Sequence, residues 1–140
     1  MLRIVFDTNV LVKLASASDR SPLFAGWQAQ AYTVVLSEEL LVELERVLKS
    51  LKIRSFVPEA RIHRFIQFVR ERAVFVTPAQ AYPHCRDPQD DMVIATAVAA
   101  HADYLITTDK DLYDDANLVA ALADLGIQVT RPGNFPTRLQ

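Results

Sequence analysis

The sequence predicts an α/β domain with a mostly parallel central sheet. Short apolar segments rich in β-branched residues alternate along the chain with segments of helical periodicity, which is the pattern of βαβ units. The chain has 140 residues, about half of them hydrophobic and only three of them glycine. It is therefore long enough for one domain with a substantial core and is unlike a disordered protein. We expect residues 1–131 to form a single domain and residues 132–140, which lack periodicity, to form an irregular C-terminal tail.

Five segments have the length and composition of strands, because they are short and rich in β-branched and aromatic residues. They are Arg3–Phe6, Tyr32–Leu36, Ala73–Val76, Tyr104–Thr107 and Ile127–Thr130.

Four segments between or after these strands carry helix signals. They are Glu38–Leu51, Pro58 to about Arg72, Pro88 to about His101, and Asp115–Leu125. Ser37 and Asp87 are suitable N-cap residues for the first and third of these helices. Gly126 is suited to the left-handed position that ends the fourth.

Charge and composition limit the classes of protein to consider. A net charge of −2 argues against binding of nucleic acid through overall positive charge, although a local basic patch remains possible. Apolar runs are broken by charge well short of the roughly 20 residues that a membrane span needs. Asp7 and Lys13 interrupt any signal-peptide core, and the single cysteine, Cys85, fits a reducing compartment. We therefore expect a soluble cytoplasmic protein.

Two aspartates directly follow predicted strands. Asp7 comes after the apolar run that ends at Phe6, and Asp109 lies just beyond the strand that ends at Thr107. Ligands of open parallel sheets bind beyond the carboxyl ends of the strands, so these two positions favour a functional site.

Two further aspartates lie in the first turn of the third predicted helix. Acids in a first turn favour the helix dipole, so Asp90 and Asp91 have a purely structural interpretation. Asp90, however, shares a face with Ile94 and Ala97, and that face must pack on the sheet. Asp91 lies on a neighbouring apolar stripe, so periodicity does not choose between the two.

Glu43 is the fourth candidate acid. It lies three residues after Leu40 and four before Val47, at the edge of the buried stripe of its helix. A glutamate beside a core seam is unfavourable unless it has a partner. The alternative is that its side chain reaches water.

Convergence of these acids would require a cation, because clustered carboxylates repel one another. Oxygen ligands suit Mg²⁺ or Mn²⁺ rather than Zn²⁺. Hard divalent ions held by carboxylates activate water and neutralise charge on a phosphate, which is the chemistry of phosphodiester hydrolysis. The hypothesis of a metal-dependent hydrolase rests on four residues: Asp7, Glu43, Asp90 and Asp109.

Four sequence motifs, in this order, resemble those of the PIN-domain ribonuclease family. They are DTNVLV after the first strand, the glutamate within SEELLVELERVL, RDPQDDMVIATA, and YLITTDKDL. The resemblance extends from about Leu2 to Leu112 and is greatest to the small VapC-like toxin components of toxin–antitoxin pairs. It implies a three-layer α/β/α sandwich and a Mg²⁺- or Mn²⁺-dependent endoribonuclease.

The resemblance also implies roles for matched residues. Asp7, Asp90 and Asp109 match metal ligands, and Glu43 matches either a further ligand or the base that orients the attacking water. Four supporting residues are implied: Asn9, which orients the first aspartate, Thr107 of the T-x-D signature, Asp91 and Asp111. The choice between Asp90 and Asp91 as direct ligand, and between one and two ions, stays open from the sequence.

The implied partners are an RNA substrate, an antitoxin protein and a second copy of the chain. Lys49, Lys52 and Arg54, with arginines of the following helix, form a candidate phosphate-binding rim, although a solvated helix face is the alternative. Three aromatic residues are candidates for stacking on bases, but we interpret them as core or dimer-interface residues: Trp27, Tyr32 and Phe68.

Other functions fit the sequence less well. A haloacid-dehalogenase-like phosphatase would need an acid where this chain has Asn9. Nucleotide-binding Rossmann and P-loop sites are excluded because no glycine-rich loop follows a strand. An RNA-processing nuclease that is not a toxin, or a non-catalytic domain that binds RNA or protein, remains as an alternative.

Overall fold

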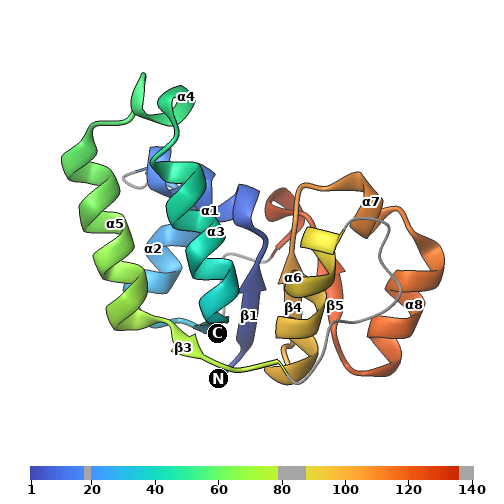
Figure 1. Cartoon of the computed structure of the whole chain (residues 1–140). Helices are drawn as coiled ribbons and strands as arrows, with labels where there is room; N and C mark the ends of the chain where they lie inside the picture. The colour runs from blue at the N-terminus through green and yellow to red at the C-terminus, as the bar shows by residue number, and fades with distance from the viewer. Residues whose placement is uncertain (18–19, 79–87, 136–140) are drawn as a thin grey trace.

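The structure is a computed structural model that describes residues 1–17, 20–78 and 88–135, with the backbone alone at residues 88–91. Its strands form one parallel sheet in the order β3-β2-β1-β4-β5 (Figure 1). The strands are β1 (Arg3–Phe6), β2 (Thr33–Leu36), β3 (Val74–Phe75), β4 (Tyr104–Ile106) and β5 (Gln128–Thr130). The five predicted strands and the parallel sheet are therefore confirmed; β1 has its predicted bounds, and the other four strands are shorter than expected.

Helices follow or separate the strands. They are α1 (Thr8–Ala17), α2 (Pro22–Gln28), α3 (Glu38–Leu48), α4 (Leu51–Arg54), α5 (Glu59–Arg72), α6 (Pro88–Ala99), α7 (Lys110–Tyr113), α8 (Ala116–Asp124) and the 3-10 turn η2 (Pro132–Asn134). Helices α1, α2, α4 and α7 were not among the sequence predictions. In the described part of the chain, no helix is both long and apolar enough to cross a membrane.

The predicted helix 38–51 is wrong in its last turn. Helix α3 ends at Leu48, and the Oγ atom of Ser50 then accepts the N–H of Ile53, 3.5 Å away, to begin α4. A second cap so close to the first helix is the physical reason for the break. The next helix begins one residue later than predicted, because Pro58 is its N-cap rather than its first residue.

In the described part of the chain, residues in the left-handed conformation follow three other helices, and the first is Gln30, which follows α2 with φ of 58°. Gly126 follows the end of α8 with φ of 82°, as predicted. His101 follows α6 with φ of 50°, although a side chain is strained there. The predicted cap Asp87 lies outside the described residues.

Alternate side chains of the strands face two different helical layers. On one face, the rings of Phe6 (β1) and Trp27 (α2) have centroids 6.1 Å apart, and Trp27 packs in turn on Phe68 of α5, at 4.9 Å. On the other face, α6 contacts β1, β2 and β4 and also packs against α3 (Figure 1). The predicted three-layer α/β/α sandwich is confirmed.

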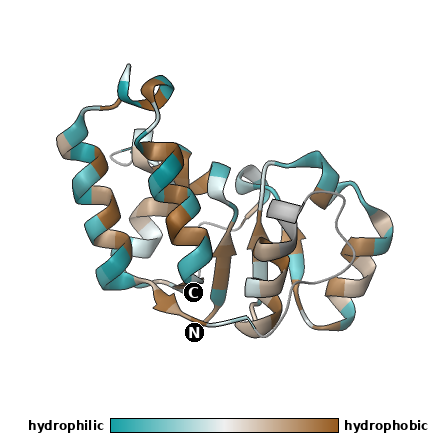
Figure 2. Cartoon of the chain, viewed as in Figure 1, coloured by the Kyte–Doolittle hydropathy of each residue, from teal (hydrophilic) through white to brown (hydrophobic). Residues whose placement is uncertain are grey.

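The core is continuous through the sheet, and strand β1 is hydrophobic over most of its length (Figure 2), with Ile4, Val5 and Phe6 fully buried. Trp27 and Tyr32 are buried, at 3% and 4% exposure, so they are core residues and not platforms for bases. The buried hydroxyl of Tyr32 donates to the carbonyl of Leu23. Phe135, which follows η2, packs edge-on against Tyr32 and is also buried. Residues 136–140 of the predicted tail lie outside the described residues, and the domain boundary at residue 131 stays a prediction.

Candidate functional site

Asp7 lies where a strand meets a helix N-terminus. Its N–H donates to the carbonyl of Ile106 in β4, at 3.0 Å, so the residue is still held to the sheet. Its own carbonyl accepts the N–H groups of Val10 and Leu11, at 3.0 and 3.1 Å, which begins α1. Asp7 therefore lies at the carboxyl edge of the sheet, as predicted for a ligand-binding position.

The side chain of Asp7 points to the face opposite to Phe6. Consecutive residues of an extended chain alternate in direction, and Phe6 packs on α2. The carboxyl of Asp7 therefore lies on the face that α6 covers, and the residue is only 6% exposed.

Thr107 links Asp7 to Asp109. The fully buried Thr107 hydroxyl donates to Oδ2 of Asp7, at 2.7 Å, and accepts the N–H of Asp109, at 3.0 Å. Oδ1 of Asp109 accepts the N–H of Asp111, at 2.9 Å, so Asp109 is the N-cap of α7. The ends of β1 and β4 thus bring two of the predicted acids into one hydrogen-bonded group.

Burial dominates the electrostatics of this group. Desolvation raises the pKa of Asp7 above its ordinary value, and the nearby charge of Asp109 raises it further. The hydrogen bonds from Thr107 and from the backbone N–H groups of Thr8 and Asn9 act in the opposite direction without cancelling the rise. Among the described residues, no basic side chain forms an ion pair with Asp7. A bound cation would compensate the charge of these buried carboxyl groups. The pair of acids is therefore suited to binding a metal ion.

Of the remaining predicted acids, only Glu43 has a side chain that the structure describes. Glu43 lies on α3 with its side chain 23% exposed, and its Oε1 is 3.0 Å from a guanidinium nitrogen of Arg46. Among the side chains that the structure describes, no three acidic, histidine or cysteine residues form a group that could hold a metal ion. Asp90 and Asp91 belong to the first turn of α6, but their side chains lie outside the described residues. Helices α3 and α6, which carry Glu43 and Asp90, pack directly against each other.

Asn9 lies beside Asp7 in the chain, and its expected role in orienting the Asp7 carboxyl stays a prediction. Its side chain is exposed on the first turn of α1, and its effect on the Asp7 carboxyl comes from its backbone N–H. The hydrogen-bonding partner that does reach the Asp7 carboxyl by its side chain is Thr107.

A family model described as PIN domain matches residues 3–111, which is more than half of the chain. The chain belongs to the PIN-domain family. No curated protein matches it. PIN domains are generally nucleases and usually use divalent metal ions, so the substrate class is nucleic acid. The match includes the four predicted acids and does not assign them individual roles.

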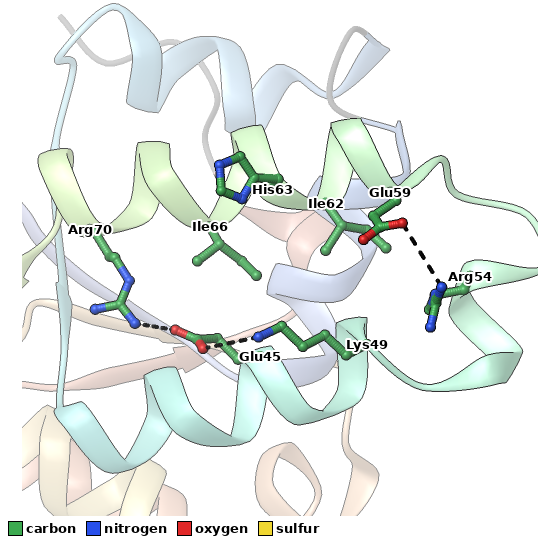
Figure 3. A pocket seen from close by; sticks show the side chains of 8 residues that line it. All are labelled: Glu45, Lys49, Arg54, Glu59, Ile62, His63, Ile66 and Arg70. Carbon is green, nitrogen blue, oxygen red and sulfur yellow. Dashed lines mark hydrogen bonds and ion pairs between the residues drawn. The ribbon is translucent and has the colours of Figure 1, made fainter.

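The PIN domain also has a second charged region, a cavity of about 390 Å³ between α3 and α5 (Figure 3). Its lining residues are Glu45, Lys49, Arg54, Glu59, Ile62, His63, Ile66 and Arg70. Glu45 lies between two cations, pairing with Arg70 and with Lys49, the latter at 3.7 Å. Arg54 and Glu59 form a looser pair at 3.9 Å. We name this region the α3–α5 groove.

The sequence predicted three cations of this groove as part of an RNA-binding rim: Lys49, Arg54 and Arg70. It did not predict that Glu45 is paired with Arg70, because the two residues lie on different helices and are 25 positions apart in the chain. The periodicity of each helix shows only which side is polar. The packing of α5 beside α3 decides which polar residues meet.

Proposed function

We propose that this PIN domain is a Mg²⁺- or Mn²⁺-dependent endoribonuclease that hydrolyses RNA and leaves a 5′-phosphate. The observation that carries the proposal is the buried Asp7 carboxyl, which is joined through Thr107 to Asp109 and has no basic partner among the described residues. Buried acids without a counter-charge are unfavourable in a merely structural role and favourable in a metal site.

In this proposal Asp7, Asp90 and Asp109 hold the ion through carboxylate oxygens. When bound, the ion lowers the pKa of a water molecule and neutralises charge that develops on the phosphate. Thr107 keeps Asp7 in one orientation by its 2.7 Å hydrogen bond. Three further residues support the ligands from outside: Asn9, Asp91 and Asp111.

Glu43 acts in the same proposal either as a further ligand or as the base that orients the attacking water. Its partner Arg46 is 66% exposed, so the pair between them is a surface ion pair that contributes little stability. Glu43 is thus able to exchange Arg46 for a water molecule or an ion at small energetic cost.

RNA is bound in this proposal by Lys49, Lys52 and Arg54, which contact phosphates and not bases. All three side chains are exposed, and Lys49 and Arg54 line the α3–α5 groove. The ion pairs of Lys49 and Arg54 are long, at 3.7 and 3.9 Å, so both cations are available to a phosphate.

The physiological role we propose is that of a cytoplasmic toxin, which acts as a homodimer and is inhibited by an antitoxin protein that covers the acidic site. The support is the resemblance of the DTNVLV, RDPQDDMVIATA and YLITTDKDL motifs to the VapC-like group. Induced expression in a bacterial host should arrest growth, whereas expression of an Asp7→Asn variant should not. Growth arrest by both proteins would contradict a nuclease-based toxin, and light scattering would test the dimer.

Cleavage of a labelled single-stranded RNA tests the enzymatic proposal directly. We expect cleavage with Mg²⁺ or Mn²⁺, none with EDTA, and a loss of at least about 100-fold for Asp7→Asn, because the variant lacks a charged ligand. Asp124→Asn is the matched control, since Asp124 is an exposed residue at the end of α8. Equal cleavage by wild type and Asp7→Asn would overturn the proposal.

A further inference from the structure

Two buried hydroxyl groups join the helices that carry Glu43 and Asp90. Ser37 is the N-cap of α3, and Thr96 lies in the middle of α6. Both residues are fully buried, and their Oγ and Oγ1 atoms are 3.0 Å apart, although the residues are 59 positions apart in the chain. A buried polar pair of this kind has a strong preference for one geometry, because a lost hydrogen bond leaves an unsatisfied group away from water.

The surrounding atoms determine how the hydroxyl hydrogens are arranged. Oγ1 of Thr96 is 2.7 Å from the carbonyl of Met92, and Oγ of Ser37 accepts the N–H of Leu40 at 3.3 Å. Each hydroxyl has one hydrogen to donate. If Thr96 donates to Met92, then Ser37 donates to Thr96, and every group has a partner. The result is a continuous chain of hydrogen bonds from the first turn of α3 to the N-terminal half of α6.

This chain is the directional contact between the two helices. In the described part of the molecule, no other side-chain hydrogen bond joins the segment of Ser37 and α3 to α6. The other contacts between the helices are apolar packing, which is roughly non-directional and permits small displacements. Glu43 follows Ser37 by six residues, and Asp90 precedes Thr96 by six, so the pair lies close in sequence to both acids.

We propose that Ser37 and Thr96 are positioning residues that fix α3 relative to α6 and thereby set the affinity of the acidic site for its metal ion. The inference rests on the proposed metal-dependent nuclease function. Neither hydroxyl contacts the ion. Loss of the pair lets the two helices shift against each other, so the acids that they carry no longer meet the Asp7–Asp109 edge at one defined spacing.

Calorimetric titration with Mn²⁺ alone tests this inference, alongside urea unfolding of each protein. Thr96→Val removes the hydroxyl and nearly keeps the shape of the side chain, and we expect Mn²⁺ affinity to fall about tenfold, as for other residues that orient metal ligands. Thr96→Ser restores the hydroxyl and should keep wild-type affinity. If Thr96→Val does not fold, Ser37→Ala serves as the second variant, because it leaves the bond from Thr96 to Met92 in place.

Ser21→Ala is the matched control for a general loss of stability. Ser21 caps α2 by accepting the N–H of Phe24 at 3.3 Å, the same length as the bond by which Ser37 caps α3. Helix α2 carries none of the candidate acids. We expect this variant to unfold at lower urea concentration and to bind Mn²⁺ as the wild type does. If Thr96→Val binds Mn²⁺ as tightly as the wild type, the inference is wrong. It is also wrong if Ser21→Ala loses as much Mn²⁺ affinity as Thr96→Val. Neither result affects the proposed nuclease function. A wild-type protein that neither binds Mn²⁺ nor cleaves RNA overturns the proposed function, and the inference with it.

Discussion

The acidic edge of the sheet and the α3–α5 groove both collect charged side chains, but they differ in access to water. At the edge, Asp7 is 6% exposed and lies beside a hydroxyl and a second acid. In the groove, the Glu45 side chain is 22% exposed and lies between Arg70 and Lys49, which are 54% and 66% exposed. The acids at the edge therefore have no basic partner among the described residues, whereas the acid in the groove is paired with two solvent-exposed cations.

This difference identifies which carboxylate is available for chemistry. Water screens the charges of the groove, so its ion pairs contribute little and their loss changes little. The same charge at the buried edge interacts strongly with every nearby dipole and ion. Burial is the main reason why the pKa of Asp7 is raised. Glu45, in contrast, is partly exposed and is paired with Arg70 and Lys49.

The largest effect on folding is expected from Thr107→Val, which keeps the shape of the side chain and removes the hydrogen bonds to Asp7 and Asp109. The Asp7 carboxylate then loses a donor while it remains buried. We expect the free energy of unfolding at neutral pH to fall by about 2 kcal/mol. We also expect the rate of RNA cleavage to fall, because Asp7 loses the hydrogen bond that orients it. Urea unfolding followed by circular dichroism measures the change.

Thr107→Ser separates the hydrogen bond from the packing. The variant keeps the hydroxyl and loses one methyl group, so it should retain most of the activity and more stability than Thr107→Val. Equal stability of the valine and serine variants would contradict the assignment of Thr107 as the link between the two acids.

The second prediction concerns pH, because the folded-state pKa of Asp7 is raised above the value of 3.8 that it has when unfolded. Between these two values the folded protein binds more protons than the unfolded protein. The contribution of Asp7 to stability is thus fully present below pH 3.8 and is lost as pH rises through the folded pKa. Without metal, Asp7→Asn should therefore become more stable relative to wild type as pH increases across that window. Added Mn²⁺ should reverse this order by stabilising only the wild type.

Urea midpoints measured in EDTA across the acidic range give the comparison. A difference between wild type and Asp7→Asn that does not change with pH would show that the Asp7 carboxyl is not unfavourably buried. Asp124→Asn, at an exposed position, should give a constant difference and serves as the control.

The fold was predictable because its signals are local. Each strand is a short β-branched run, and Gly126 adopts the left-handed conformation that its position after a helix indicates. Helix α4 was missed because the preceding helix was predicted to continue to Leu51, and only the hydrogen bond to Ser50 reveals the break. Helix α1 was missed because its start at Asp7 has the appearance of a functional site, and the same residue also begins the helix.

The site was predictable only where it follows from topology. Asp7 and Asp109 follow neighbouring parallel strands, so their proximity is a consequence of the sheet order. The contact of Ser37 with Thr96 depends on how two helices pack, and the pattern of each helix alone does not contain that information. The partner of Glu43, by contrast, follows from the sequence, because Arg46 is the basic residue that helical spacing brings beside it.

The third prediction tests the groove. Glu45→Gln removes the acid that Arg70 and Lys49 share, and because all three side chains are at least partly exposed we expect a loss of no more than about 1 kcal/mol. The loss should become smaller in high salt, whereas the effect of Thr107→Val should not. A loss as large as that of Thr107→Val would contradict the distinction between the two regions.

The smallest effect on stability is expected from Arg54→Gln. Among the described residues, the only ion pair of Arg54 is the 3.9 Å contact with Glu59, whose side chain is 84% exposed. Stability should therefore change by less than about 0.5 kcal/mol. If Arg54 binds a phosphate as proposed, the same variant should nevertheless weaken RNA binding for every sequence and reduce the salt dependence of binding by about one counter-ion. Fluorescence anisotropy of the metal-free protein with a labelled RNA, at several salt concentrations, measures both quantities. Unchanged affinity and salt dependence would leave Arg54 as a solvated residue of a helix face and would contradict its proposed contact with RNA.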